Sequence, residues 1–214
     1  MIRLAIVGDI GSGKSYVAKQ FGYPVFNADA EVAKLYRKSR KCHNKLKKIL
    51  PNYITSFPVK KIELSKAIMA NQQNLKKIIK VVHPEVRNRM NNFIKKNRGK
   101  KLIILDIPLL IENKLNKKND ILIFVNAKKK EINKRLKKRH SASIKILKKF
   151  QLPVELKKKK ADFIIKNNFK SDSIKKNVKI ILRKILLNAL SYIIYGNNRF
   201  IYFRKAHDRG NWMY

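Results

Sequence analysis

The chain has 214 residues, 44% of them hydrophobic, which is enough for one substantial α/β domain with a packed core. No segment reaches the roughly 18 uninterrupted apolar residues of a membrane span, and a single cysteine, Cys42, excludes an intrachain disulfide. The chain starts with a strand-like run and shows no signal peptide, so we expect a cytoplasmic protein with no membrane partner.

The formal net charge is +40, from 53 Lys and Arg against 13 Asp and Glu. Such a charge invites nucleic-acid binding, because clustered basic residues displace counterions from phosphates. Here the lysines are scattered along nearly every polar helix face, and Lys, Asn and Ile are all over-used, as in a genome rich in A and T. A dedicated nucleic-acid-binding protein concentrates its charge on one face or tail. We therefore expect loose attraction to polyanions and no specific nucleic-acid partner.

The first predicted elements enclose a glycine-rich stretch. Ile2–Val7 is apolar enough for a buried strand, and a helix is expected over Lys14–Phe21. Between them, "GDIGSGKS" (Gly8–Ser15) matches the phosphate-loop pattern G-x-x-x-x-G-K-S/T in full. Glycines let successive backbone N–H groups converge on phosphate oxygens at the start of a helix. The stretch therefore predicts a nucleoside triphosphate, ATP, as ligand.

Each residue type in this loop suggests a role. Lys14 is expected to reach the β- and γ-phosphates, and the Ser15 hydroxyl to bind Mg²⁺. The residues of this stretch expected to bind the nucleotide are Gly8, Gly11, Ser12, Gly13, Lys14, Ser15 and Tyr16.

A short second strand, "YPVFNAD" (Tyr23–Asp29), is expected to lead into a helix over Ala30–Lys38. Asp29 would end this strand beside the phosphate loop, where an acceptor hydroxyl would lie. A carboxylate there can orient the hydroxyl and take its proton during phosphoryl transfer. Asp29 could also cap the helix that starts at Ala30, and the two roles are compatible.

A long helical stretch follows. Apolar spacing predicts helices over Asn44–Leu50, Ile62–Ala70, Leu75–Val82 and from Pro84 to about Lys96. The whole stretch from about Ala30 to Asn97 is too large for one crossover helix. We expect an inserted helical subdomain over residues 30–97.

In the rest of the chain, predicted strands again alternate with predicted helices. Strands are expected at Lys101–Pro108, Asp120–Asn126 and Ala161–Asn167, and helices at Lys129–Lys138 and Ser171–Leu187. Strands alternating with helices predict a parallel sheet of about five strands flanked by helices, within a kinase domain of residues 1–188. The aromatic extension of residues 189–214 is a packed segment, an oligomer contact or a tail, and we expect a monomer or weak homo-oligomer.

The other motifs narrow the class of nucleotide-binding protein. Asn116–Asn119 fails the base-reading N-K-x-D pattern of a GTPase in its fourth residue, and Asp106 is a single acid where a motor ATPase has a strong acidic pair. Small-molecule kinases have this chain length and a basic lid. The segment 128–150, which holds Arg135 and Arg139, is predicted to be that lid.

Several motifs in chain order resemble the dephospho-coenzyme A kinase family. They are "IGSGKS", "YPVFNAD", a segment ending in "HPEVR" (His83–Arg87), "LDIPLLIEN" (Leu105–Asn113), "RLKKR" (Arg135–Arg139), Gln151 and "ADFIIKNN" (Ala161–Asn168). The resemblance covers about Ile2 to Leu187. The phosphate loop is common to many families, and its combination with "HPEVR" and "DIPLLIEN" is far more specific.

The resemblance implies transfer of the γ-phosphoryl group of ATP to the ribose 3′-hydroxyl of dephospho-CoA. In it Asp29 would be the base, Lys14 and Arg139 would stabilise the transferring charge, and Ser15 and Asp106 would hold Mg²⁺. The residues expected to bind the acceptor are Asp29, Leu109 and, in the helical subdomain of residues 30–97, His83 and Arg87. The resemblance also implies that Asn167, on the last predicted strand, binds the nucleotide. The alternatives are another small phosphate-loop kinase and, less favoured, a basic nucleic-acid-binding NTPase.

The chain departs from the family pattern at a few positions. Asp9 replaces a glycine, Tyr16 a threonine and Asn27 an acid, and Phe169 stands near the place where the family often has glycine. Asp9 would put a negative side chain near phosphates.

Overall fold

The computed structural model of the chain describes residues 1–137 and 151–195, and the side chains of this part as far as 189. These residues form a five-stranded sheet in the order β2-β3-β1-β4-β5, with every neighbouring pair parallel. The strands are β1 (Ile2–Gly8), β2 (Val25–Asn27), β3 (Leu102–Asp106), β4 (Ile121–Ala127) and β5 (Phe163–Asn167). The predicted α/β class with a parallel sheet is confirmed.

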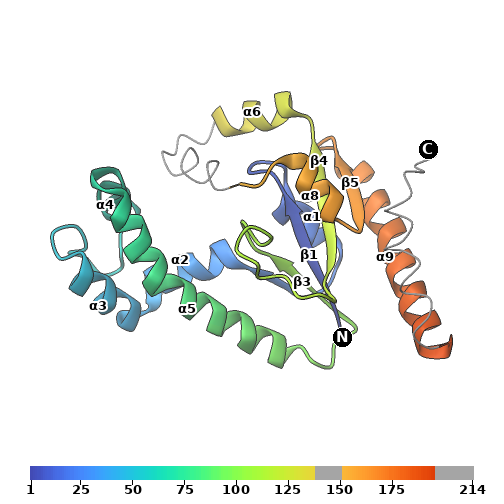
Figure 1. Cartoon of the computed structure of the whole chain (residues 1–214), viewed down its shortest axis with the longest axis horizontal. Coiled ribbons are helices and arrows are strands. Elements are labelled where there is room, and N and C mark those ends of the chain that lie inside the picture. The colour runs from blue at the N-terminus through green and yellow to red at the C-terminus, as the bar shows by residue number, and fades with distance from the viewer. Residues whose placement is uncertain (138–150, 196–214) are drawn as a thin grey trace.

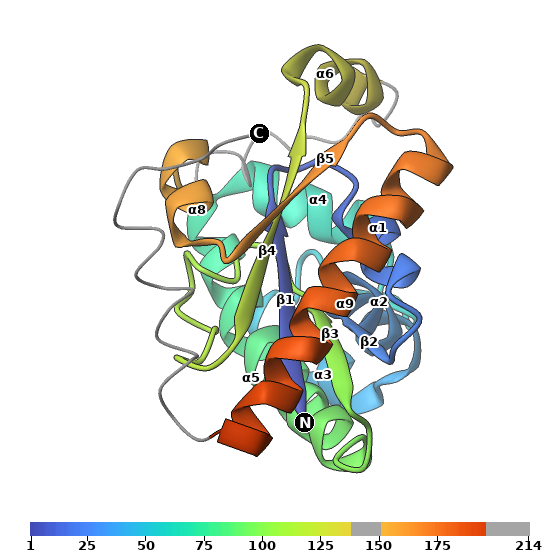
Figure 2. The same cartoon turned by 90° about the vertical axis from the view of Figure 1, so that its right-hand side faces the viewer.

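The central strands are apolar on both faces because helices cover both faces. On one face α1 (Lys14–Gln20) and α9 (Ser171–Tyr195) share a core with β1, β3 and β4. On the other face the C-terminal half of α5 (Gln72–Lys96) and the segment around α8 (Val154–Lys160) complete a second core. Figure 2 shows α9 lying across one side of the sheet, with α5 behind it.

Four helices separate β2 from β3. They are α2 (Ala28–Lys38), α3 (Arg40–Ile49), α4 (Lys61–Ala70) and α5, and they enclose a third core around Leu35, Leu46 and Ile78. Figure 1 shows α3 and α4 standing away from the sheet while α5 leads back to it. The helix α5 therefore belongs to two cores, one at each end.

This double packing explains one wrong prediction. The expected break at Pro84 does not occur, and α5 runs unbroken through that residue. A proline inside a helix removes one hydrogen bond and crowds the preceding turn. Here Ile78 and Val82 are held in the third core, and Phe93 and Ile94 pack on the sheet. The packing on both sides of Pro84 outweighs the local cost.

Other helix bounds also differ from the prediction. The helix expected from Ala30 begins at Ala28, and α3 begins at Arg40, where the Ser39 hydroxyl accepts a hydrogen bond from the Cys42 N–H. The helix α8 was not expected, and α9 continues to Tyr195, past the predicted end at Leu187. The helix α6 (Lys129–Lys137) lies where a helix was predicted. No helix in the described ranges is long and apolar enough to cross a membrane.

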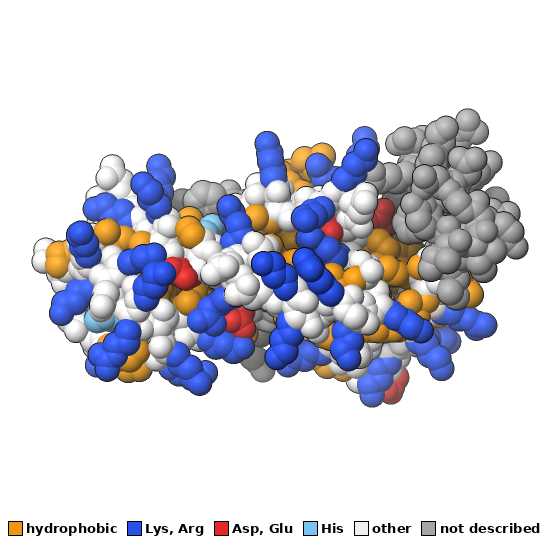
Figure 3. Space-filling model, turned by 90° about the horizontal axis from the view of Figure 1, so that it is seen from below, with side chains coloured by type: hydrophobic (Ala, Val, Ile, Leu, Met, Phe, Trp, Pro, Cys, Tyr) orange, Lys and Arg blue, Asp and Glu red, His pale blue; other side chains and the backbone are white. Residues whose placement is uncertain are grey.

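The basic side chains are spread over the surface. On the face seen in Figure 3, Lys and Arg side chains stand over the whole length of the molecule, with few acidic groups among them. This face shows no single basic patch that would mark one binding surface.

One buried carboxylate organises the helical insertion. Glu63, 9% exposed, lies in the first turn of α4. Its Oε1 accepts hydrogen bonds from the backbone N–H groups of Thr55 and Ser56 at 3.2 and 3.0 Å and from the Thr55 hydroxyl at 2.8 Å. Its Oε2 accepts from the Lys60 N–H at 3.1 Å. Burial raises the pKa of Glu63, but these hydrogen bonds together outweigh it and lower the pKa to about 2.

We predict that Glu63→Gln destabilises the fold by about 1–3 kcal/mol at pH 7, because the amide turns one acceptor into a donor facing the Lys60 N–H. A carboxylate with a depressed pKa stabilises the fold fully above its unfolded pKa, near 4.5, and loses this contribution as the pH falls through about 2. Urea unfolding of both proteins at pH 7 and pH 3 should therefore show a smaller difference at pH 3. An equal difference at both pH values would contradict the assignment.

Candidate functional site

The glycine-rich loop joins β1 to α1 through a backbone that only glycine adopts readily. Gly8 and Gly13 have φ values of 145° and 92°. A Cβ on Gly8 would lie 2.8 Å from the Val125 carbonyl oxygen, and one on Gly13 would lie 2.4 Å from Asn167 Nδ2. Both conformation and space therefore require glycine at these two positions. The loop ends at Gly13, which is the N-cap of α1. The free N–H groups at the start of that helix therefore lie beside the loop.

Lys14, the first residue of α1, folds back over the loop. Its Nζ donates to the carbonyl oxygens of Gly8 at 3.1 Å and Asp9 at 2.9 Å. Burial lowers the pKa of Lys14 most, the charge of Asp106 opposes this effect, and the nearby charge of Lys157 adds to it. An ammonium that is poorly hydrated and beside backbone carbonyls can readily exchange these partners for an anion.

The side chains of Ser12 and Tyr16 lie in different surroundings. Ser12 is fully buried, and its Oγ has no hydrogen-bond partner among the described residues. Its backbone N–H donates to the Asp9 carbonyl at 3.1 Å. The Tyr16 hydroxyl donates to Ser171 Oγ at 2.9 Å, at the start of α9. The Tyr16 hydroxyl therefore links α1 to α9, and nucleotide binding by Ser12 and Tyr16 stays a prediction.

Asn167, at the end of β5, supports the loop from behind. Its Nδ2 donates to the Ser12 carbonyl at 2.7 Å, and its Oδ1 accepts from the Phe169 N–H at 2.7 Å. Phe169 has a positive φ of 62°, and the Arg135 guanidinium lies 4.4 Å from the centre of its ring. Asn167 is therefore a support of the phosphate loop, with both polar atoms of its side chain already bonded.

Asn27 connects three residues of the site. In the paired strands β2 and β3 it lies opposite Asp106, and its Nδ2 donates to Asp106 Oδ2 and, at 3.4 Å, to Ser15 Oγ. Its Oδ1 accepts from the Ala30 N–H at 2.7 Å and so caps α2. The alternative that Asp29 caps this helix is wrong, and so is the prediction that Asp29 ends the strand. The strand ends at Asn27, and Asp29 lies in the first turn of α2.

Asp29 lies close enough to Asp106 and Lys14 to interact with their charges. The residue is exposed as a whole, but partial burial of its carboxyl group, followed by the negative charge of Asp106, raises its pKa. The positive charge of Lys14 opposes this shift. Asp29, Asp106 and Lys14 therefore act on one another electrostatically at the carboxyl edge of the sheet, where open parallel sheets bind ligands.

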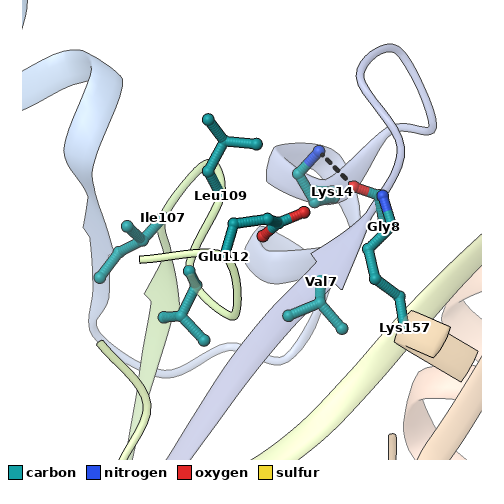
Figure 4. Close-up of a pocket in the computed structure, with 8 residues that line it drawn as sticks. Val7, Gly8, Lys14, Ile107, Leu109, Glu112 and Lys157 are labelled. Atoms are coloured by element: carbon teal, nitrogen blue, oxygen red, sulfur yellow. Dashed lines mark hydrogen bonds between the residues drawn. The ribbon is translucent and has the colours of Figure 1, made fainter. Parts of the chain in front are cut away.

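A small pocket opens between the ends of β1 and β3. Its lining is Val7, Gly8, Lys14, Ile107, Leu109, Leu110, Glu112 and Lys157. Figure 4 shows the Glu112 carboxylate directed into this space, with Lys14 above it. Leu109, expected to bind the acceptor, has a positive φ of 54°, a strained backbone for a leucine. Glu112 Oε1 also accepts from the Leu152 N–H at 3.1 Å, while Gln151 Oε1 accepts from the Ile10 N–H at 3.4 Å.

Two of the predicted acceptor-binding residues lie in the helical insertion. His83 and Arg87 are exposed on α5, one helical turn apart in the helical insertion. Arg139 lies outside the described residues, as does the rest of the predicted lid from 138 to 150. Of the predicted lid, the structure describes α6 and the residues just before it.

The donor set suits a cation that is held partly by its substrate. Among the described residues, no group of three or more His, Cys, Asp or Glu side chains could hold a metal ion by itself. The Ser15 hydroxyl and the Asp106 carboxylate are both reached by the Asn27 amide. Mg²⁺ usually takes one or two such protein oxygens together with waters and phosphate oxygens, so these residues fit that ion.

Two residues of the site were not predicted from the sequence. Asn27 carried a visible signal, since asparagine before a helical run is a common N-cap, but it was noted only as a replaced acid. Lys157 carried none, because it is one of four consecutive lysines and the periodicity there predicts no helix.

Substitution of Gly13 should show that the loop needs glycine. We predict that Gly13→Ala lowers ATP affinity more than tenfold, because a Cβ forces the loop away from Asn167. Gly22→Ala is a matched control: Gly22 also has a positive φ, 72°, but, apart from its chain neighbours, no described residue has an atom within 4 Å of the new Cβ. It should destabilise the fold by roughly 1–2 kcal/mol and leave ATP affinity unchanged. Equal ATP affinities for the two variants, measured by calorimetry, would refute the prediction.

The sequence matches a known family over most of its length. The family model for dephospho-CoA kinase matches residues 2–173. The dephospho-CoA kinase of Wolbachia pipientis wMel is 32% identical over 192 residues, which cover 86% of this chain and 98% of that protein. The dephospho-CoA kinase of Bacillus cereus strain ATCC 14579 is 30% identical over 195 residues, covering 85% and 96%.

Solved structures agree with the fold. TT1252 from Thermus thermophilus superposes with a TM-score of 0.70 at 28% identity and covers 86% of this chain and 97% of that one. Dephospho-CoA kinase from Campylobacter jejuni superposes with a TM-score of 0.59 at 22% identity, over 86% and 96% of the two chains, and supports the fold alone. The family match over residues 2–173, together with relatives aligned over nearly their whole length, shows that the chain belongs to the dephospho-CoA kinase family.

Proposed function

We propose that the chain transfers the γ-phosphoryl group of ATP to the ribose 3′-hydroxyl of dephospho-CoA, giving coenzyme A and ADP. The observation that carries this proposal is the family match over residues 2–173, a range that includes a complete phosphate loop whose Lys14 interacts electrostatically with Asp29. The bond that forms joins the acceptor 3′-oxygen to the γ-phosphorus. The bond that breaks joins that phosphorus to the oxygen shared with the β-phosphate.

Asp29 is the general base of this reaction. It lies in the first turn of α2, and its carboxylate interacts electrostatically with both Lys14 and Asp106. Its carboxylate accepts a hydrogen bond from the 3′-hydroxyl and takes the proton as the new P–O bond forms. Burial of the carboxyl group and the charge of Asp106 raise the pKa of Asp29, which makes it a better proton acceptor than an ordinary aspartate.

Lys14 and the loop bind the phosphates. The loop N–H groups around Gly11 and Gly13 and the start of α1 hold the triphosphate oxygens. Lys14 exchanges its bonds to the Gly8 and Asp9 carbonyls for oxygens of the β- and γ-phosphates. Arg139, in the predicted lid, supplies a further positive charge, since a cation placed over the transferring group stabilises the charge that shifts in the transition state.

Ser15 and Asp106 hold Mg²⁺ in this proposal, with Asn27 fixing the orientation of both side chains. The ion supplies charge neutralisation and alignment of the phosphate oxygens. His83 and Arg87 in the α2–α5 insertion and Leu109 beside the phosphate loop bind the acceptor.

The reaction is proposed to take place in the cytoplasm, in a monomer or weak homo-oligomer. The single cysteine, Cys42, is buried in the third core, which is compatible with a reducing compartment.

A coupled assay of ADP release tests the proposal. ADP should form from ATP only when dephospho-CoA is added, and mass spectrometry should identify coenzyme A as the other product. AMP and a small hydroxylated metabolite serve as control acceptors. If one of these were phosphorylated and dephospho-CoA were not, the chain would be a different phosphate-loop kinase.

The high positive charge does not favour a nucleic-acid-binding NTPase, because the basic groups are spread over the face seen in Figure 3. Scattered charge binds polyanions only electrostatically, and such binding weakens by roughly 10³–10⁵-fold between low and physiological salt. RNA binding that survives near-physiological salt would support the alternative.

A further inference from the structure

A buried lysine lies behind the phosphate loop. Lys157, on α8, is 2% exposed, and its Nζ lies 2.7 Å from Asp9 Oδ1. The neighbouring Lys158 forms its ion pair with Glu155, which is 81% exposed, on the surface of the same helix. Burial of an ammonium group is unfavourable unless it is paired, and a buried pair is often no more stable than apolar residues of the same size. The position of Lys157 therefore calls for a reason other than stability.

Lys157 faces the same pocket as Lys14. Both residues line the space between β1 and β3, and Figure 4 shows the Lys157 side chain extending from α8 up to Gly8. The charge of Lys157 is close enough to lower the pKa of Lys14. The pocket thus has two ammonium groups at the beginning of the phosphate loop.

Asp9 holds these two cations together. Its carboxylate accepts from Lys157 and its backbone carbonyl accepts from Lys14 at 2.9 Å. Asp9 Oδ1 is the one acceptor found for Lys157 Nζ among the described residues, so two of the three N–H groups of the ammonium stay available. Asp9 alone would repel phosphate, and Lys157 neutralises it. The loop therefore tolerates the acid Asp9 because Lys157 neutralises it, and Lys157 can be buried because Asp9 pairs with it.

We propose that Lys157 is a second phosphate-binding cation of this site, held against the phosphate loop by Asp9. Its free N–H groups bind phosphate oxygens, either of the ATP triphosphate or of the diphosphate in dephospho-CoA. The inference rests on the proposed function for the identity of these ligands. It does not involve the lid residues.

The test measures binding of each phosphate ligand separately. Calorimetry with ATP, ADP and dephospho-CoA compares the wild-type chain with Lys157→Met and with the control Lys158→Met, which removes a lysine from the same helix. We expect Lys157→Met to weaken at least one ligand about tenfold or more, and Lys158→Met to change each less than twofold. An effect on ATP without one on ADP assigns the γ-phosphate, and an effect on dephospho-CoA alone assigns the acceptor.

A second pair of variants separates binding from folding. Asp9→Asn and the double variant Asp9→Asn with Lys157→Met have the same loop sequence and differ only in the lysine. The double variant has no unpaired buried charge. It should bind the affected ligand about tenfold more weakly than Asp9→Asn does. If Lys157→Met lowered only the unfolding midpoint, with unchanged affinities for all three ligands in both backgrounds, Lys157 would be a structural ion pair and the proposal would be overturned.

The proposed function has its own readout in this experiment. Wild-type protein that forms no coenzyme A from dephospho-CoA contradicts the function, whatever Lys157→Met does to ATP binding. Conversely, normal coenzyme A formation with equal ligand affinities in all variants contradicts only the role of Lys157.

Discussion

Asp29→Asn should lower the turnover number with dephospho-CoA by about 10²–10⁴-fold, the usual effect of removing a general base, and leave ATP affinity nearly unchanged. The amide has the size of the carboxylate but cannot take the proton of the 3′-hydroxyl. Asn27, not Asp29, caps α2, so the substitution preserves the cap and removes only a favourable charge near the helix N-terminus. Steady-state kinetics and calorimetry with ATP measure the two effects.

Glu31→Gln is the matched control for this prediction. Glu31 lies in the same first turn of α2, but its carboxylate bonds to Lys34 at 2.6 Å and to Arg89 at 2.9 Å and so belongs to the packing of α2 on α5. The control removes the same charge from the same turn and should alter turnover only a few-fold. Turnover of Asp29→Asn within a few-fold of the wild-type rate would show that another group accepts the proton.

The sequence predicted best the features that depend on local residue order. The phosphate loop is a contiguous pattern, and its glycines at 8 and 13 have the positive φ values and close contacts that only glycine tolerates. The five strands were recognisable because a strand covered on both faces is almost wholly apolar, as in Leu102–Asp106. Neither feature requires knowledge of which residues, distant in the sequence, pack against it.

Features that depend on distant contacts were missed or misplaced. Pro84 was expected to start a helix, but α5 passes through it because two separate cores hold its two halves. The N-cap of α2 was given to Asp29 because the strand was expected to end two residues later than it does. The role of Lys157 depends on its contact with Asp9, which lies 148 positions earlier in the chain. No local pattern distinguishes such a lysine from its three neighbours.

Lys14→Met should have the second large effect. Its ammonium now contacts the loop carbonyls of Gly8 and Asp9, and phosphate oxygens would replace these carbonyls on binding. Removing one preorganised charge from a transition-state site typically lowers the turnover number about 10²–10³-fold. ATP affinity should fall as well, because the same group binds the ground-state phosphates. The combined loss distinguishes this variant from Asp29→Asn, which should lose turnover alone.

Lys19→Met and Lys14→Arg complete the test. Lys19 is an exposed lysine in the last turn of the same helix, so its loss changes the net charge equally and should leave both turnover and ATP affinity within about twofold of wild type. Lys14→Arg keeps the charge but replaces a compact ammonium with a planar fork that does not fit between the two carbonyls, and it should not restore activity. If Lys14→Met retained more than a tenth of the wild-type turnover at saturating ATP, Lys14 would bind nucleotide without stabilising the transition state. The charge required for transfer would then come from another cation, and Lys157, which pairs with Asp9 and whose charge lowers the pKa of Lys14, is the cation to test next.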